Sequence, residues 1–172
     1  GPEKAKFLKQ IVRKVQPNIM IECGTAIGYS GPWIAHELQA IGTGKLITIE
    51  IDPERASEAQ SNFTQAGVSH LVDSRIGDAR NVLNDIDVAV DLLLLDNDFQ
   101  NYFPCFQAIE PQLTNEATLV ADNVGIGADS MKDYLDYTRS RYQTELHWFE
   151  IDLPWVNRDA VEIAVYQKPP SA

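Results

Sequence analysis

The chain of 172 residues is poor in basic side chains and in cysteine, and both shortages limit its function. Its 14 Lys and Arg residues face 25 Asp and Glu residues, which gives a formal net charge of −11 at pH 7. Because an acidic surface repels phosphate backbones, we expect no nucleic-acid partner. The two cysteines, Cys23 and Cys105, both stand in apolar stretches. Two thiols do not make a disulfide framework, so we expect a reducing, cytoplasmic setting.

Long apolar runs, repeats and low-complexity segments are also missing from the sequence. No stretch approaches the ~20 apolar residues that a membrane-spanning helix needs, so we expect no membrane partner. Hydrophobic residues make up 44% of the chain, enough for one core of ordinary size. We therefore expect residues 1–172 to form a single domain.

The apolar spacing predicts an alternation of helices and strands along the chain. We expect helices over residues 4–15, 30–41, 53–66, 101–113 and 129–142, and strands over 18–23, 45–51, 71–76, 91–95, 117–121, 146–151 and 161–166. The turn at 154–159 predicts that the last two strands pair antiparallel. Such alternation is typical of a doubly wound α/β fold, here a seven-stranded, mostly parallel sheet with an antiparallel last strand and helices on both faces.

The turn after the first strand is the first place to look for a ligand, because ligands bind beyond the carboxyl ends of such strands. A dinucleotide fold needs glycine at the positions of Gly24, Ala26 and Tyr29, and two of these three residues do not fit. The mismatch disfavours a pyrophosphate ligand and leaves an NAD-dependent oxidoreductase as the weaker alternative. Gly24 and Gly28 also fit ordinary turn glycines.

Two acids follow the second and third strands. Glu50 ends the second strand, where a carboxylate can accept hydrogen bonds from both hydroxyls of a ribose. In the alternative interpretation, Glu50 only flanks the next helix and binds no ligand. Asp78 follows Gly77 and either faces an adenine amino group or caps a short helix.

Oxygen-bearing side chains also follow the fourth and fifth strands. Asp96 ends the fourth strand, and Asp122 and Asn123 follow the fifth. Because adjacent strands lie roughly 5 Å apart, these end residues can converge on one ion. Two carboxylates and an amide oxygen favour Mg²⁺, Ca²⁺ or Mn²⁺. In the alternative, Asp96 and Asp98 cap a helix while Asp122 and Asn123 form a turn.

With these motifs the chain resembles the catechol and caffeoyl-coenzyme A O-methyltransferase family. The resemblance rests on the segments 22–30, 49–52, 77–79 and 122–123. It implies an S-adenosylmethionine site made by Glu22, Gly24, Ser30, Glu50, Ile51, Gly77, Asp78, Ala79 and Asp96, and a divalent metal held by Asp96, Asp122 and Asn123. It also implies methyl transfer to a hydroxyl group of a small catechol-like or phenolic acceptor.

The sequence departs from this family at one position. The family usually carries a lysine, its general base, three residues after the first metal-binding aspartate, and this chain has Phe99 there. Asp98 is the alternative base, and we expect Asp96 and Asp98 to be the catalytic acids. A non-catalytic S-adenosylmethionine-binding module is the other alternative that Phe99 leaves open.

The sequence also offers two candidates for covering the acceptor pocket. The segment 152–159, with Trp155 and Arg158, is a candidate wall, and a plain surface loop is its alternative. A homodimer, in which a partner subunit covers the pocket, is a further expectation.

Overall fold

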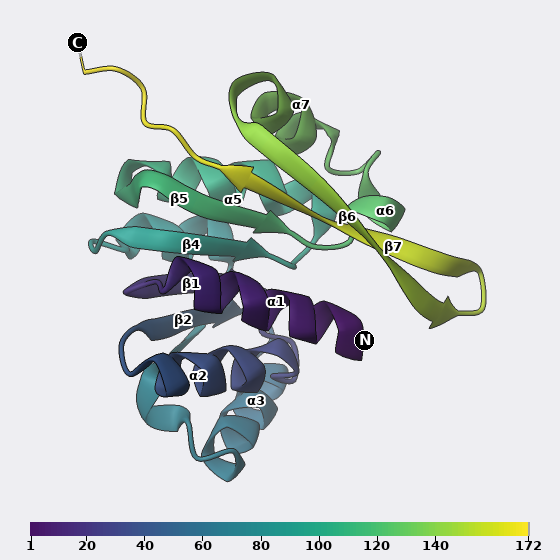
Figure 1. Cartoon of the computed structure of the whole chain (residues 1–172). Helices are drawn as coiled ribbons and strands as arrows, with labels where there is room; N and C mark the ends of the chain where they lie inside the picture. Colours follow the sequence, from purple (N-terminus) through teal and green to yellow (C-terminus); the bar gives the residue numbers. More distant parts are fainter. Residues whose placement is uncertain (172) are drawn as a thin grey trace.

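A seven-stranded sheet runs through the computed structural model, which describes residues 1–171 (Figure 1). Its strands are β1 (Ile19–Cys23), β2 (Lys45–Glu50), β3 (Val72–Ile76), β4 (Val90–Leu95), β5 (Leu113–Ala121), β6 (Gln143–Leu153) and β7 (Val156–Val165). The strands lie in the order β3-β2-β1-β4-β5-β7-β6. β7 pairs antiparallel with both β5 and β6, while the pairs from β3 through β5 are parallel. The predicted doubly wound, mixed sheet is confirmed.

Helices cover both faces of this sheet. The α-helices are α1 (Pro2–Val15), α2 (Ser30–Ile41), α3 (Pro53–Gln65), α4 (Ala79–Val82), α5 (Tyr102–Ile109), α6 (Val124–Gly127) and α7 (Lys132–Arg141). Four 3₁₀ turns join them: η1 (Ser69–Leu71), η2 (Leu83–Asp85), η3 (Phe99–Asn101) and η4 (Glu110–Gln112). Apolar side chains of α1 and α2 pack on one face of the sheet, and those of α4, α5 and α7 pack on the other.

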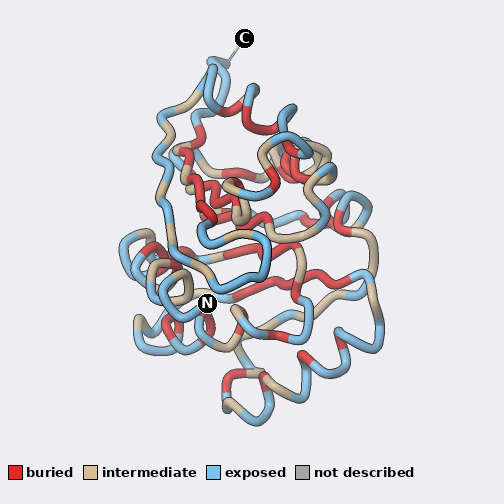
Figure 2. The backbone as a smooth tube through the Cα atoms, turned by 90° about the vertical axis from the view of Figure 1, so that its right-hand side faces the viewer, coloured by how far each residue is buried: buried red, intermediate tan, exposed pale blue. Residues whose placement is uncertain are grey.

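Strand β4 shows how the sequence pattern produces these layers. Leu92 and Leu94 join the apolar cluster under α1 and α2, whereas Leu93 and Leu95 join the cluster under α5 and α7. Successive side chains of a strand point to opposite faces, so an unbroken apolar run suits a strand covered on both sides. Buried residues accordingly follow the strands through the middle of the molecule (Figure 2).

Several element boundaries differ from the prediction. The helix expected over 101–113 ends at Ile109, and β5 begins at Leu113 instead of residue 117. Pro111 lies in the intervening turn η4 and has no N–H for a continued helix. The helix expected from residue 129 begins at Lys132. The turn expected over 154–159 is also shorter, because β7 already begins at Val156.

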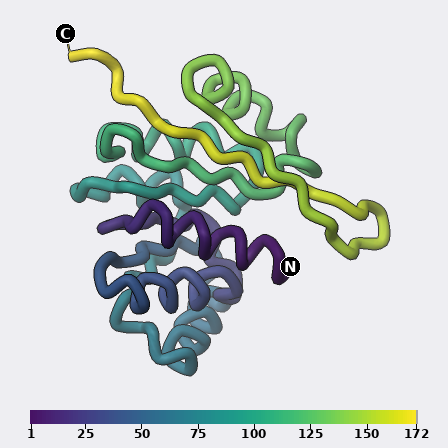
Figure 3. The backbone as a smooth tube through the Cα atoms, viewed as in Figure 1, coloured from purple at the N-terminus to yellow at the C-terminus, as the bar shows by residue number. Residues whose placement is uncertain are grey.

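The carboxyl ends of the parallel strands define the side on which the site lies. In Figure 1 the arrowheads of β4 and β5 point toward the start of α1 and the tip of the β6–β7 hairpin. The tube in Figure 3 shows the hairpin extending beyond the sheet on this same side. Three distant parts of the chain therefore gather where a doubly wound fold binds its ligand.

Within residues 1–171, no helix combines the length and apolarity needed to cross a membrane.

Candidate active site

The loop after β1 is held tightly against the ends of the neighbouring strands. Gly24 has φ +100°, and its N–H donates to the Ile49 carbonyl oxygen at 2.9 Å. A Cβ atom at Gly24 would run into the Asp96 carbonyl oxygen and lie 2.7 Å from the Asp96 carbonyl carbon. Glycine is therefore required here both by conformation and by close backbone approach.

Glu50 fastens the same loop from the end of β2. Its carboxylate is almost fully buried and accepts hydrogen bonds from the N–H of Ala26 at 2.7 Å and of Asp52 at 3.0 Å. The Arg55 guanidinium lies 3.3 Å from the same carboxylate. Each carboxylate oxygen has a further lone pair, so Glu50 can still accept a ligand hydroxyl.

A depression that we call the Glu50 hollow opens beside this carboxylate. It is lined by seven of the predicted cofactor residues: Gly24, Glu50, Ile51, Gly77, Asp78, Ala79 and Asp96. Asp98, predicted as a catalytic acid, lines this hollow too. Ser30 lies outside it and lines a second depression beside α1, and Glu22 lines neither.

Glu22 lies buried beneath these depressions at the end of β1. Its carboxylate accepts hydrogen bonds from Ser30 Oγ and, at 2.6 Å, from Thr48 Oγ1. Burial raises the pKa of Glu22 to about 7, although the bonds from Ser30 and Thr48 oppose the rise. Glu22 therefore holds Ser30 in place, and its own part in cofactor binding stays a prediction.

Because the folded pKa of Glu22 lies above its ordinary value of 4.5, the folded state binds more protons than the unfolded state between these values. The contribution of Glu22 to stability is therefore fully present below pH 4.5 and is lost as the pH rises toward 7. We expect Glu22→Gln to remove this dependence: between pH 5 and pH 8 the free energy of unfolding of the wild type should fall by up to about 3 kcal/mol relative to that of the variant. Urea unfolding at several pH values measures the difference.

The exposed Glu58→Gln is the matched control for this prediction, since it removes the same charge from the surface of α3. It should keep the wild-type pH dependence. If the free energy of unfolding of Glu22→Gln changed with pH as that of the wild type does, Glu22 would not titrate in this range.

Asp78 takes the capping role that the sequence left open. Its carboxylate accepts a hydrogen bond from the Arg80 N–H at 2.9 Å and caps α4. The Arg80 guanidinium also binds this carboxylate and holds the pKa of Asp78 below its ordinary value. Asp78 still lines the Glu50 hollow, so its contact with an adenine group stays a prediction.

Asp96 and Asp122 leave neighbouring strands side by side, as predicted. Leu95 of β4 is in register with Ala121 of β5, and the Asp122 N–H donates to the Leu95 carbonyl oxygen at 3.0 Å. Tyr102 OH donates to the Asp122 carbonyl oxygen at 2.9 Å and fixes the backbone at this point.

Two further charged residues join this cluster, and the sequence did not single them out as site residues. Lys4 Nζ donates to Asp122 Oδ1 at 2.5 Å and to Asp159 Oδ2 at 2.7 Å. The Lys4 side chain is 14% exposed and that of Asp159 only 1%. Asn123 Nδ2 also donates to Asp159 Oδ2, at 2.8 Å. We call Lys4, Asp96, Asp122, Asn123 and Asp159 the acid cluster.

The charges of the acid cluster shift one another's pKa values. Burial alone would lower the pKa of Lys4, but Asp122 and Asp159 outweigh it and raise the pKa. Burial alone would raise the pKa of Asp159, yet hydrogen bonds from Lys4 and Asn123 lower it. Burial, helped by the Asp122 and Glu22 carboxylates, raises the pKa of Asp96 well above its ordinary value. The cluster thus contains an ammonium group among three carboxyl groups.

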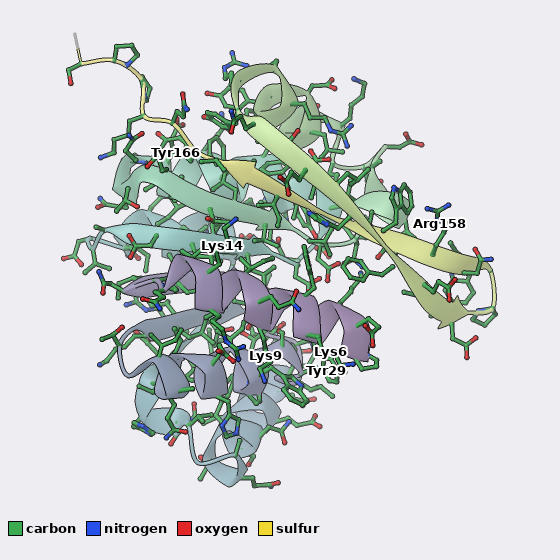
Figure 4. The ribbon with its side chains drawn as sticks, in the orientation of Figure 1. Lys6, Lys9, Lys14, Tyr29, Arg158 and Tyr166 are labelled. Atoms are coloured by element: carbon green, nitrogen blue, oxygen red, sulfur yellow. The ribbon has the colours of Figure 1, made fainter. Side chains whose placement is uncertain are left out.

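Two depressions flank the acid cluster. The first, the α1 hollow, is lined by Ser30, Trp33, Asp96 and Asp122 together with Lys4 and apolar residues of α1. Figure 4 shows Tyr29, another of its lining residues, near the start of α1. The second, the hairpin hollow, is lined by Asn123, Ile126, Phe149, residues 150–153, Asp159 and the first four residues of the chain. Lys4 lines both hollows.

The predicted pocket wall at 152–159 is right only in part. Asp152, Leu153 and Asp159 line the hairpin hollow, whereas Trp155 and Arg158 do not. Trp155 is 78% exposed at the hairpin tip. The Arg158 guanidinium stacks on the Trp148 ring, 4.2 Å from its centroid. Since β7 begins earlier than expected, Arg158 and Asp159 are neighbours on one strand, and their side chains point to opposite faces.

Phe99, at the position of the missing lysine, is packed against its neighbours. Its ring lies edge-on to Tyr102 with 6.1 Å between centroids. A Cβ atom at Gly127 would lie 2.7 Å from Phe99 Cδ2, so the ring fits closely against α6. Phe99 lines none of the three hollows. Phe99 therefore packs against the hydrophobic core beside Tyr102 of α5 and Gly127 of α6.

Asp96, Asp122 and Asn123 fit a hard divalent cation by the type of atom they offer. Among residues 1–171, no donor hydrogen-bonds the Asp96 carboxylate, and Asn123 uses its amide nitrogen on Asp159, which leaves its oxygen available. Asp122, in contrast, is already paired with Lys4. No group of three His, Cys, Asp or Glu side chains in the described part of the chain is arranged to hold a metal.

The fold has close counterparts among solved methyltransferases. An O-methyltransferase from Streptomyces achromogenes, solved with S-adenosylmethionine, superimposes with a TM-score of 0.84 at 23% identity, over 98% of this chain and 81% of that one. An O-methyltransferase from Bacillus cereus, solved with S-adenosylhomocysteine, gives a TM-score of 0.83 at 22% identity, over 97% and 82%. The architecture is therefore the Rossmann-like fold of these methyltransferases.

Sequence comparison narrows this class to a family. Residues 1–153 match the O-methyltransferase family, and the chain belongs to it. The catechol O-methyltransferase of Niastella koreensis is 36% identical over 129 residues, which cover 72% of this chain and 57% of that protein. The mouse catechol O-methyltransferase is 28% identical over 181 residues, with coverage of 100% and 66%. The chain thus spans about three fifths of these two relatives.

Proposed function

We propose that the chain transfers a methyl group from S-adenosylmethionine to a hydroxyl group of a small catechol-like or phenolic acceptor. The observation that carries this proposal is that the three hollows adjoin one another and share lining residues. Gly24 and Asp96 line both the Glu50 hollow and the α1 hollow, and Lys4 lines both the α1 hollow and the hairpin hollow. A donor and an acceptor can therefore meet at the acid cluster.

We assign the nucleoside of the cofactor to the Glu50 hollow. Glu50 would accept the ribose hydroxyls, while Ile51, Gly77, Asp78 and Ala79 form the adenine side. The amino-acid end of the cofactor would lie toward Ser30 in the α1 hollow. Burial raises the pKa of Asp96, and a positively charged sulfonium group nearby would favour the ionised form of this carboxyl group.

We assign the acceptor to the hairpin hollow, with its reacting oxygen toward the acid cluster. Phe149, Ile126 and Leu153 offer apolar surface to an aromatic ring there. Asp96, Asp122 and Asn123 would hold a divalent metal, whose charge orients two neighbouring oxygens and lowers the pKa of a hydroxyl group. Asp98 lines only the Glu50 hollow, and its part in proton transfer stays a prediction.

The experiment is a turnover assay with S-adenosylmethionine and a panel of catechols and phenols. We expect methylated catechol and S-adenosylhomocysteine in equal amounts by mass spectrometry, with a loss of tenfold or more when a chelator removes Mg²⁺. Asp122→Asn should lose a similar factor, and the exposed Asp129→Asn should retain the wild-type rate.

The two alternatives give different results in the same preparation. Binding of S-adenosylmethionine without turnover on the whole panel would favour a non-catalytic module and overturn the proposed activity. Binding of a nicotinamide cofactor in place of S-adenosylmethionine would favour an oxidoreductase. Full turnover in the presence of the chelator would leave the methyl transfer in place and remove the metal from the proposal.

A further inference from the structure

We propose that Lys4 contacts the acceptor and stabilises its reacting oxygen as an oxyanion. This inference rests on the proposed function and gives Lys4 a role different from that of the general base missing at Phe99. Lys4 comes from the first helix of the chain, far in sequence from its two partners, Asp122 after β5 and Asp159 in β7. Its contact with substrate would make it a catalytic residue.

The number of donors on the Lys4 ammonium group supports a ligand contact. An ammonium group has three N–H donors, and Asp122 and Asp159 use two of them. No third acceptor within residues 1–171 binds Lys4 Nζ. Because Lys4 lines both the α1 hollow and the hairpin hollow, the remaining donor is available where donor and acceptor would meet.

Asp159 does not need Lys4 for its own hydrogen bonds. Asp159 Oδ1 accepts from the Ile126 N–H at 3.1 Å and from the Ala160 N–H at 2.8 Å, and Oδ2 accepts from Asn123 Nδ2. Both oxygens of this buried carboxylate would be bonded without the lysine. The hydrogen bonds that hold β7 against α6 therefore do not require the ammonium group, which balances the charge of the buried carboxylate and retains one donor that the described residues leave unused.

The chemistry requires only that Lys4 keep its charge. The acceptor hydroxyl loses its proton to a base in the solvent, and a lone pair of the resulting oxyanion forms the bond to the methyl carbon. The electron pair of the broken carbon–sulfur bond returns to sulfur, which becomes a neutral thioether. A cation beside the oxygen favours its ionised form, so Lys4 promotes the step without taking up a proton.

The test uses 4-nitrocatechol, whose absorbance distinguishes the phenol from the phenolate. The probe is titrated with pH in the ternary complex with S-adenosylhomocysteine, in the presence of a chelator so that no metal contributes. We expect the wild-type protein to favour the phenolate about tenfold over free solution, which is a shift of about one pH unit. Lys4→Met should lose this shift, and Lys4→Arg should retain part of it.

Lys6→Met is the matched control, because Lys6 lies on the same helix, is 70% exposed and pairs only with Glu3 among the described residues (Figure 4). It removes the same charge and should leave the spectrum of the bound probe unchanged. Circular dichroism of each variant verifies the fold, and Lys4→Arg retains a cation if Lys4→Met fails to fold.

Each other outcome contradicts a stated claim. An unshifted probe in the wild-type complex, or an equal shift in Lys4→Met, would overturn the role of Lys4. If the probe binds only when Mg²⁺ replaces the chelator, the same titration is run with Mg²⁺, and an equal probe pKa in the wild type and Lys4→Met would overturn the role of Lys4 while the proposed function stands. If the probe binds under neither condition, both the role of Lys4 and the assigned acceptor class are wrong.

Discussion

Gly24→Ala should destabilise the fold by about 3 kcal/mol or more and abolish binding of S-adenosylmethionine. The added Cβ would collide with the Asp96 backbone, and φ at this position is +100°. Relief of the collision must separate β1 from β4 at their carboxyl ends, where Gly24 and Asp96 line both the Glu50 hollow and the α1 hollow. Urea unfolding gives the loss of stability, and calorimetry gives the loss of affinity.

Gly42→Ala is the control, because it adds a Cβ atom at a positive φ without a collision and so measures the cost of backbone strain alone. Gly42 has φ +88° at the end of α2, but a Cβ there meets nothing within 4 Å. Strain of this kind costs about 1 kcal/mol, and cofactor affinity should be unchanged. If Gly24→Ala behaved like Gly42→Ala in both measurements, the close approach of the two strands would not define the site.

Glu50→Gln should weaken S-adenosylmethionine binding tenfold or more, which corresponds to about 1.4 kcal/mol. Glutamine has one acceptor oxygen where Glu50 uses two, so either Ala26 or Asp52 loses the acceptor of its N–H. The loop and a ribose hydroxyl then compete for the oxygen that remains. Calorimetric titration measures the change.

Glu54→Gln removes the same charge from an exposed position at the start of α3. Its affinity for the cofactor should equal that of the wild type. Equal affinities for Glu50→Gln and Glu54→Gln would exclude Glu50 from the cofactor site.

The parts of the site that the sequence predicted follow from strands and their ends. The apolar run 92–95 has the composition of a doubly covered strand, and the register of β4 with β5 then brings Asp96 beside Asp122. A parallel sheet places all its carboxyl ends at one edge, so a motif after each strand is enough to assemble the Glu50 hollow.

Contacts between residues that are far apart in the sequence could not be predicted in this way. Lys4 and Asp159 are 155 positions apart, and nothing near either one indicates an ion pair. Glu22 lies within the apolar strand β1, but its burial and its bond to Thr48 depend on the packing of β1 against β2. The sequence also offered two roles for Asp78: the structure shows that it caps α4, while its contact with an adenine group stays a prediction.

The most direct measurement is a crystal structure of the chain with S-adenosylhomocysteine and Mg²⁺. The account predicts density for the ribose hydroxyls on the Glu50 carboxylate, the amino-acid end beside Ser30, and the sulfur pointing toward Asp96 and Lys4. A nucleoside bound elsewhere on the protein, with Glu50 still occupied only by backbone N–H groups, would contradict the account.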